Sequence, residues 1–248
     1  MTWPYPRVIA HRGGGTLAPE NTLAAVKEGM HRGFRAIEFD VMLARDGVPV
    51  VMHDPYLGRT LAGSGHIPDY DSTELAAMDA GSWYSAAYAG EPVPYFVAFA
   101  EFCKANGIWM NIEIKPVPGH EAVTGAAVAR IAATLFAAEL GTPAAPLLSS
   151  FSMEALVAAQ TAAPGVARAC LFDELPPDWQ AHTRALGAVA IHTNHQHLTQ
   201  ASAETIKAAG LGLLCYTVNR PARARELLSW GVDALCTDRL DLIGPNFA

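Results

Sequence analysis

The sequence has few of the features that mark membrane, secreted or nucleic-acid-binding proteins. None of its apolar runs approaches the roughly 18 residues that a membrane span requires. The N-terminal stretch MTWPYPRVIA lacks a charged segment followed by a long apolar one, so no signal peptide is predicted. Lysine and arginine total 17 against 24 aspartates and glutamates, and they form no basic cluster. The net charge of −7 argues against nucleic acid and against stable association with an anionic membrane.

Cysteine is scarce as well. The 248-residue chain has four cysteines, at positions 103, 170, 215 and 236, without CxxC spacing. The last three lie in apolar runs typical of strands, where a buried free thiol is the expected state. Free thiols and the lack of a targeting segment together predict a cytoplasmic protein.

The chain does contain a regular alternation of short apolar runs and longer helical stretches. Eight runs have the length and composition of strands: 7–11, 36–43, 109–115, 146–151, 167–172, 188–194, 212–218 and 233–238. Amphipathic stretches such as 21–33, 152–165 and 201–210 lie between most of them. Strands that are apolar on both faces predict a TIM (β/α)8 barrel, built as one domain over residues 1–248. A doubly wound open sheet is the alternative, although no GxGxxG motif follows the first strand.

A ninth β-type run, residues 49–53, falls outside this count. Only a few residues separate it from the second strand, and they include Asp46-Gly47, a strong hairpin signal. The run is therefore predicted to return antiparallel to the second strand. With Asp46 and Gly47 as the two turn residues, the register places His53 opposite Asp40.

Residues 54–98 also fall outside the repeating pattern. They are rich in Gly, Pro, Asp and Tyr and show no strand–helix rhythm. A segment of this length is usually functional or a small insertion. We predict an inserted subdomain at the carboxyl end of the second strand, where barrel active sites lie. Its stretch GSWYSAAY, residues 81–88, could bind an alcohol group of a substrate or form the aromatic core of the insertion.

Acidic residues gather at the carboxyl ends of the predicted strands. Glu38 and Asp40 share one face of the second strand, and Asn111, Glu113 and Lys115 share one face of the third. Three carboxylates converging in a barrel repel one another unless a cation lies between them. Hard oxygen ligands select Mg²⁺ or Ca²⁺ rather than zinc. We therefore expect the three acids to bind one of these divalent cations.

Two histidines reach the same end of the barrel, His11 after the first strand and His53 after the hairpin. Imidazole titrates near neutral pH, so one ring can donate a proton while the other accepts one. Arg12 and Lys115 add two cations, which could pair with the acids but would leave one of the three negative charges for a metal. Such a set suits cleavage of a phosphate ester. Asp54 is either a turn residue or a partner that orients His53.

The first histidine opens the polar stretch HRGGGTLAPENT, residues 11–22. Its three consecutive glycines would let the backbone turn sharply and approach an anion with N–H donors. Glu20 and Asn21 are expected to continue the rim of the site. Asn21 could also cap the helix that follows.

The motifs HRGGGTLAPENT, EFDVMLARDGVPVVMHD, NIEIKP, LLSSF, YTVN and WGVDALCTD, in this order, resemble the glycerophosphodiester phosphodiesterase family. The resemblance covers nearly the whole chain, and the closing segment resembles the bacterial cytoplasmic members associated with glycerol-3-phosphate uptake. It implies a TIM barrel with a small insertion after the second strand. It also implies metal-dependent hydrolysis of small-molecule glycerophosphodiesters to an alcohol and sn-glycerol 3-phosphate.

The resemblance assigns roles to individual positions. His11 and His53 match the catalytic acid and base, and Arg12 and Lys115 match the cations that contact the phosphate. The metal ligands match Glu38, Asp40 and Glu113. Many members have Trp where this chain has Tyr216, which is expected to form a wall against the glycerol or alcohol group. The attacking oxygen is either water or the vicinal hydroxyl of glycerol.

Other interpretations use the same residues. Cleavage resembling that of lysophospholipase D or sphingomyelinase D would share the histidine pair but needs access to a lipid surface. A non-catalytic binder, or a barrel enzyme that abstracts a proton next to a carboxylate, would not explain both histidine motifs. His192, His195 and His197 lack a standard zinc spacing, so loop polarity or a substrate-facing His192 is favoured over zinc. Phe39, Met42 and Phe151 are assigned to the core.

Overall fold

A closed barrel of parallel strands forms the centre of the molecule in the computed structural model, which describes residues 3–248. Its strands are β1 (Val8–Ala10), β2 (Ala36–Leu43), β4 (Trp109–Ile114), β5 (Leu147–Ser150), β6 (Ala167–Phe172), β7 (Ala190–Asn194), β8 (Gly212–Tyr216) and β9 (Ala234–Thr237). They pair in the order β1-β9-β8-β7-β6-β5-β4-β2, and β1 also pairs with β2, which closes the ring. The predicted (β/α)8 barrel is confirmed, and the open sheet is wrong. Met1 and Thr2 of the N-terminal stretch lie outside the described residues.

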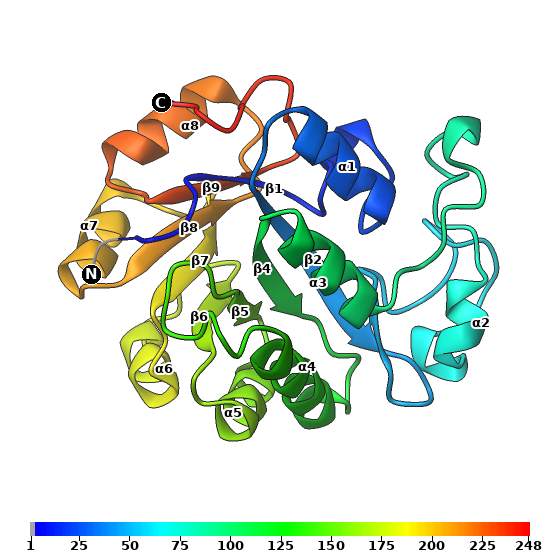
Figure 1. Ribbon diagram of the computed structural model, residues 1–248. Coiled ribbons are helices and arrows are strands. Elements are labelled where there is room, and N and C mark those ends of the chain that lie inside the picture. The colour runs from blue at the N-terminus through cyan, green and yellow to red at the C-terminus, as the bar shows by residue number, and fades with distance from the viewer. Residues whose placement is uncertain (1–2) are drawn as a thin grey trace.

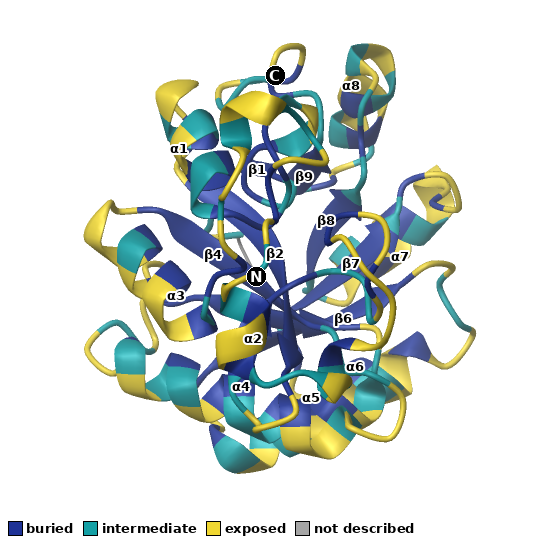
Figure 2. Ribbon diagram, turned by 90° about the vertical axis from the view of Figure 1, so that its right-hand side faces the viewer, coloured by how far each residue is buried: buried dark blue, intermediate teal, exposed yellow. Residues whose placement is uncertain are grey.

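Helices surround the strands on the outside (Figure 1). They are α1 (Leu23–His31), α3 (Phe96–Ala105), α4 (Glu121–Leu135), α5 (Met153–Ala162), α6 (Trp179–Leu186), α7 (Gln200–Ala208) and α8 (Pro221–Ser229). Each turns a buried face toward the barrel and an exposed face outward (Figure 2), as expected for amphipathic crossover helices. In residues 3–248, none of the helices has the length and apolar character needed to cross a membrane.

The core has one layer between strands and helices and another inside the barrel. Phe39 and Met42 are buried, as predicted. At the amino-terminal end of the strands, the Tyr5 ring stacks on Trp109 with centroids 4.6 Å apart. Trp3 packs edge-on against Tyr5 at 5.0 Å, so aromatic rings fill this end. Phe151 was wrongly assigned to the core: it follows the last residue of β5 and is 47% exposed, because it has left the strand for the barrel mouth.

The hairpin forms, but its register differs by one residue from the prediction. Strand β3 (Pro49–Val51) runs antiparallel to β2 and aligns Val51 with Val41. The next backbone N–H along, that of Met52, donates to the carbonyl of Asp40. The prediction that His53 lies opposite Asp40 is therefore wrong, and His53 lies beyond the last ladder bond.

The turn explains the shift. The backbone N–H of Ala44 donates to the carbonyl of Val48 at 3.0 Å, which leaves three residues, 45–47, in the loop instead of two. Gly47 has φ of 76°, the left-handed conformation that ends a three-residue hairpin loop. Asp46-Gly47 marks the turn, but Arg45 belongs to it as well.

The segment between β3 and α3, cyan to green in Figure 1, stands beside β2 at the side of the barrel. It contains η2 (Ile67–Asp69), α2 (Ser72–Ala76) and η3 (Ala86–Tyr88). Its apolar side chains form a separate cluster with residues of β2 and β3: Met42, Val50, Leu57, Leu61, Ile67, Leu75 and Val93. Residues 96–98, predicted to be part of the insertion, are the first turn of α3 instead.

Candidate active site

The loop from β1 to α1 turns sharply at the carboxyl end of the barrel. Arg12 and Asn21 adopt positive φ angles of 50° and 59°, which non-glycine residues rarely do. Gly15, with φ of 56°, lies so close to the end of β9 that a Cβ atom would sit 2.2 Å from the Asp238 carbonyl oxygen. The N–H of Thr16 donates to the same oxygen at 2.9 Å. Gly15 is therefore required for close packing of this loop against the last strand.

Strands β2 and β4 bring three carboxylates together at this end. Glu38, Asp40 and Glu113 are buried, and one carboxylate oxygen of each lies within 4.8 Å of the others. Burial, and then repulsion from Asp40, raise the pKa of Glu38 well above its usual range and that of Glu113 to about 7. Without a bound cation, some of these carboxyl groups therefore stay protonated, and the cluster carries less than its full negative charge.

The donor set fits a hard divalent cation. Glu38 Oε1 and Glu113 Oε1 are buried and accept no hydrogen bond, although Lys115 Nζ lies 3.5 Å from Glu113 Oε1. Buried carboxylate oxygens without a hydrogen bond are costly. Carboxylate oxygens are the ligands that Mg²⁺ and Ca²⁺ prefer. Within residues 3–248, they are the one such group of His, Cys, Asp or Glu side chains.

Asp40 is held ionised by its neighbours. Lys115 Nζ donates to its Oδ1 at 3.3 Å, and Arg12 Nε lies 3.6 Å from its Oδ2. Burial alone would raise the pKa of Asp40, but Lys115 and then Arg12 hold it well below its usual range. Asn21 Nδ2 donates to Oδ2 at 2.9 Å, and Asn21 Oδ1 accepts from the Asp40 N–H. Asn21 thus fixes this carboxylate, and Thr22, not Asn21, caps helix α1.

His11 is oriented by a residue from the far end of the chain. Its Nδ1 donates to Asp238 Oδ1 at 2.6 Å, and its Nε2 lies 3.8 Å from Glu38 Oε2. Asn219 Nδ2 donates to the second oxygen of Asp238 at 2.9 Å. The ring therefore turns Nε2 toward the acidic cluster. Asp238 and Asn219 were not predicted, although both lie at strand ends in the quoted motifs WGVDALCTD and YTVN.

His53 has a carboxylate partner of its own. Its Nδ1 donates to Asp54 Oδ1 at 2.6 Å, which favours an orienting role for Asp54 over a simple turn role. Burial is the main cause that lowers the pKa of His53, with Arg12 and Lys115 adding to it and Asp40 opposing it. The ring therefore tends to be neutral near pH 7.

A chain of ion pairs links the two halves of the site. Arg59, a residue of the insertion that was not predicted, donates through Nε to Asp54 Oδ2 at 2.6 Å. Its two terminal nitrogens donate to the two oxygens of Glu20 at 2.7 Å each. Arg12 Nη1 donates to the same carboxylate at 2.7 Å. Glu20 thus connects the loop after β1 to the insertion.

Two aromatic side chains pack together at the carboxyl end of the barrel. Tyr216, at the end of β8, donates from its hydroxyl to the Phe172 carbonyl at 2.9 Å. Its ring packs edge-on against Phe151, with centroids 5.9 Å apart. The exposed Phe151 and the half-buried Tyr216 form an apolar wall at the barrel mouth.

His192, His195 and His197 do not converge into a group of metal ligands in the described part of the chain. His192 is fully buried inside the barrel, where its ring centroid lies 6.5 Å from that of Trp3, so it does not face a substrate. Burial lowers its pKa to about 3, so it is neutral.

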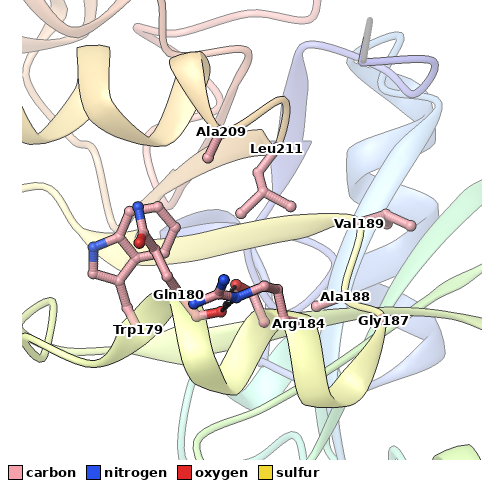
Figure 3. A pocket seen from close by; sticks show the side chains of 9 residues that line it. Trp179, Gln180, Arg184, Gly187, Ala188, Val189, Ala209 and Leu211 are labelled. Atoms are coloured by element: carbon pink, nitrogen blue, oxygen red, sulfur yellow. Dashed lines mark hydrogen bonds between the residues drawn. The ribbon is translucent and has the colours of Figure 1, made fainter.

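A separate hollow of about 450 Å³ lies between helix α6 and the residues that precede β7 and β8 (Figure 3). It is lined by apolar residues such as Trp179, Val189 and Leu211. Because residues before parallel strands lie at their amino ends, this hollow is away from the acids and histidines. None of the acids, histidines or cations of the candidate site lines it.

Comparison with known proteins agrees with this geometry. The glycerophosphoryl diester phosphodiesterase family matches residues 11–242. A glycerophosphodiester phosphodiesterase of Caldanaerobacter subterraneus is 31% identical over 93% of each chain. A phosphodiesterase from Oleispira antarctica, solved in complex with the product sn-glycerol 3-phosphate, is 36% identical with a TM-score of 0.85, covering 94% of this chain and 93% of that one. An Agrobacterium tumefaciens glycerophosphodiester phosphodiesterase is 28% identical with a TM-score of 0.77 over 98% of both chains. The chain belongs to the glycerophosphodiester phosphodiesterase family.

Proposed function

We propose that this protein hydrolyses glycerophosphodiesters to an alcohol and sn-glycerol 3-phosphate, using Mg²⁺ or Ca²⁺. The observation that carries the proposal is the pair of Asp-oriented histidines, His11 and His53, close to three buried carboxylates. The product bound by the Oleispira antarctica relative supports the substrate class. The cation would be held by Glu38, Asp40 and Glu113, and it would neutralise charge on the phosphoryl oxygens.

The remaining groups have distinct tasks. Arg12 and Lys115, both beside Asp40, contact the phosphate and add positive charge. His53, whose pKa is lowered, accepts the proton of the attacking oxygen. His11 Nε2, with Asp238 behind its other nitrogen, donates a proton to the leaving alcohol. The attacking oxygen is water or the vicinal hydroxyl of glycerol, whose intramolecular attack has a large effective-molarity advantage. Attack by the hydroxyl would expel the alcohol and form a cyclic phosphate, which water then opens to glycerol 3-phosphate.

The surroundings of the site belong to the same proposal. Tyr216 and Phe151 form the wall against the glycerol group. Besides contacting the substrate, Glu20 and Asn21 hold the charged side chains of the site in place. The substrates are water-soluble diesters, not a membrane surface. The four buried free cysteines support a cytoplasmic location. The separate apolar cluster around Ile67 supports an inserted subdomain within a single barrel domain.

The experiment couples metal-stripped protein to glycerol-3-phosphate dehydrogenase. Glycerophosphocholine, glycerophosphoethanolamine and glycerophosphoglycerol are supplied with EDTA, Mg²⁺ or Ca²⁺. We expect metal-dependent release that is lost in both His11→Ala and His53→Ala. His182→Ala is the matched control, because His182 pairs with Asp178 at 3.3 Å on the surface of α6 and should keep full activity. The absence of release from every diester with every metal would refute the proposal.

A further inference from the structure

A hollow of about 530 Å³ opens next to His11 and Arg12, and Tyr216 does not line it. The loop after β1 forms one wall, and the insertion forms the other through Arg59, Trp83 and Tyr84. Neither aromatic residue belongs to the barrel. The insertion therefore supplies side chains to a space that adjoins the proposed reacting groups.

The two aromatic residues present ring faces rather than polar atoms. Trp83 Nε1 donates to the Ala80 carbonyl at 2.9 Å, and the Tyr84 hydroxyl donates to the Thr16 carbonyl at 2.9 Å. Both donors are thus engaged within the protein. The rings stand nearly perpendicular, at 83°, with centroids 5.8 Å apart, and Trp83 is 41% exposed. They form a two-sided aromatic corner on the insertion side of the hollow.

The charges around this corner are already paired. Glu20 accepts from Arg12 and Arg59, and Asp238 accepts from His11 and Asn219. A ligand group that brings many hydrogen-bond donors, such as a primary ammonium or a polyol, would have to share these carboxylates with the donors that already engage them. A quaternary ammonium brings no donors, and aromatic faces attract it through the cation–π interaction.

We propose that Trp83 and Tyr84 line the subsite for the leaving alcohol and favour a trimethylammonium group, as in glycerophosphocholine. This inference rests on the proposed phosphodiesterase activity. It places the leaving oxygen beside His11, which lines the same hollow, and the glycerol toward Tyr216 and Phe151 at the barrel mouth. Substrate preference is then set by the insertion, while the barrel grips the shared glycerol phosphate.

The test measures kcat and KM of wild type, Trp83→Leu and Trp83→Phe for glycerophosphocholine and glycerophosphoglycerol, which differ only in the leaving alcohol. For Trp83→Leu we expect KM for glycerophosphocholine to rise about five- to tenfold, and KM for glycerophosphoglycerol to change less than about twofold. Trp83→Phe, which keeps a ring face, should recover most of the difference. Choline chloride should inhibit glycerophosphoglycerol hydrolysis competitively in wild type and several-fold more weakly in Trp83→Leu.

Tyr56→Leu is the matched control, because Tyr56 is an aromatic residue of the same insertion that is 55% exposed and does not line the hollow. It should behave as wild type with both substrates. An equal loss for both substrates in Trp83→Leu, or no loss for either, would overturn the inference while leaving the activity established. If wild type releases no glycerol 3-phosphate from either diester, the proposed function fails instead.

Discussion

At its amino-terminal end the barrel is filled by Trp3, Tyr5 and Trp109, whereas at its carboxyl-terminal end it buries three carboxylates beside Arg12 and Lys115. Strand β4 contributes to both ends, with Trp109 at one and Glu113 at the other, while Trp3 and Tyr5 come from the segment before β1. The aromatic end gains free energy from apolar burial. The acidic end buries charge that is only partly compensated, which is destabilising without a cation. Stability and function are thus concentrated at opposite ends of the strands.

The largest effect should come from removing the charge that the acidic end is built around. In Asp40→Asn, Lys115 and Arg12 lose their shared carboxylate and the proposed metal site loses a ligand. We expect kcat/KM to fall about 10³-fold, with weaker Mg²⁺ binding by calorimetry. The matched control is Asp233→Asn, because Asp233 pairs with Lys207 just before β9, near the amino-terminal end. That variant should lose stability but keep its kcat, and equal loss of activity in the two variants would contradict the division between ends.

Truncating a side chain at the aromatic end should lower stability and leave kcat nearly unchanged. In Trp109→Ala the stacking on Tyr5 is lost, along with the hydrogen bond from its indole nitrogen to the Ala145 carbonyl. We expect the free energy of unfolding to fall by about 3–5 kcal/mol, measured by urea denaturation. At a temperature where the variant is folded, its kcat should stay within about twofold of wild type. A kcat loss that exceeds the loss of folded protein would show that the two ends are coupled.

Removing the partner of a histidine should have an intermediate effect on catalysis. In Asp238→Asn, His11 loses the carboxylate that sets its tautomer and ring orientation. We expect kcat to fall about 10²-fold with little change in KM, because the groups that hold the phosphate are untouched. Asn219→Ala, which removes only the support behind Asp238, should lower kcat less. A change confined to KM in either variant would argue against a positioning role.

The smallest effect is a pH dependence of stability in the metal-free protein. Burial raises the pKa of Glu113 to about 7 from an ordinary value of 4.5. Between these values the folded protein keeps a proton that the unfolded chain has lost, so this stabilising contribution is present at low pH and disappears as pH rises toward 7. Over that range we expect the Tm of wild type to fall by about 5 °C relative to Glu113→Gln. Parallel plots of Tm against pH for the two proteins would contradict this prediction. Added Mg²⁺ should remove the difference in pH dependence between them.

The sequence predicts the barrel well because its strands are defined by local composition. Strands β2 and β6 begin and end at the predicted residues, and the others differ by one or two at their ends. The hairpin register was off by one residue, because a two-residue and a three-residue loop share the same Asp-Gly signal. Phe151 was misplaced because a strand pattern cannot show where the backbone leaves the sheet.

The site could be predicted only where it lies on strands. The acids share faces that strand periodicity fixes, so Glu38, Asp40 and Glu113 were expected to converge. Asp238 and Arg59 were missed for a different reason. Their contacts depend on the closure of the barrel and on the fold of an irregular insertion, neither of which leaves a periodic signal in the sequence.

The bond between His11 and Asp238 joins residues 227 positions apart in the chain. During synthesis, the histidine therefore emerges from the ribosome long before its partner. The pairing of β1 with β9 that brings them together likewise requires the strand of the barrel that is made last. A nascent chain can fold much of its sheet before then, but it cannot orient this imidazole. The enzyme is therefore expected to become active only after the last strand of the barrel has left the ribosome. Until then, the unfinished chain does not act on substrate.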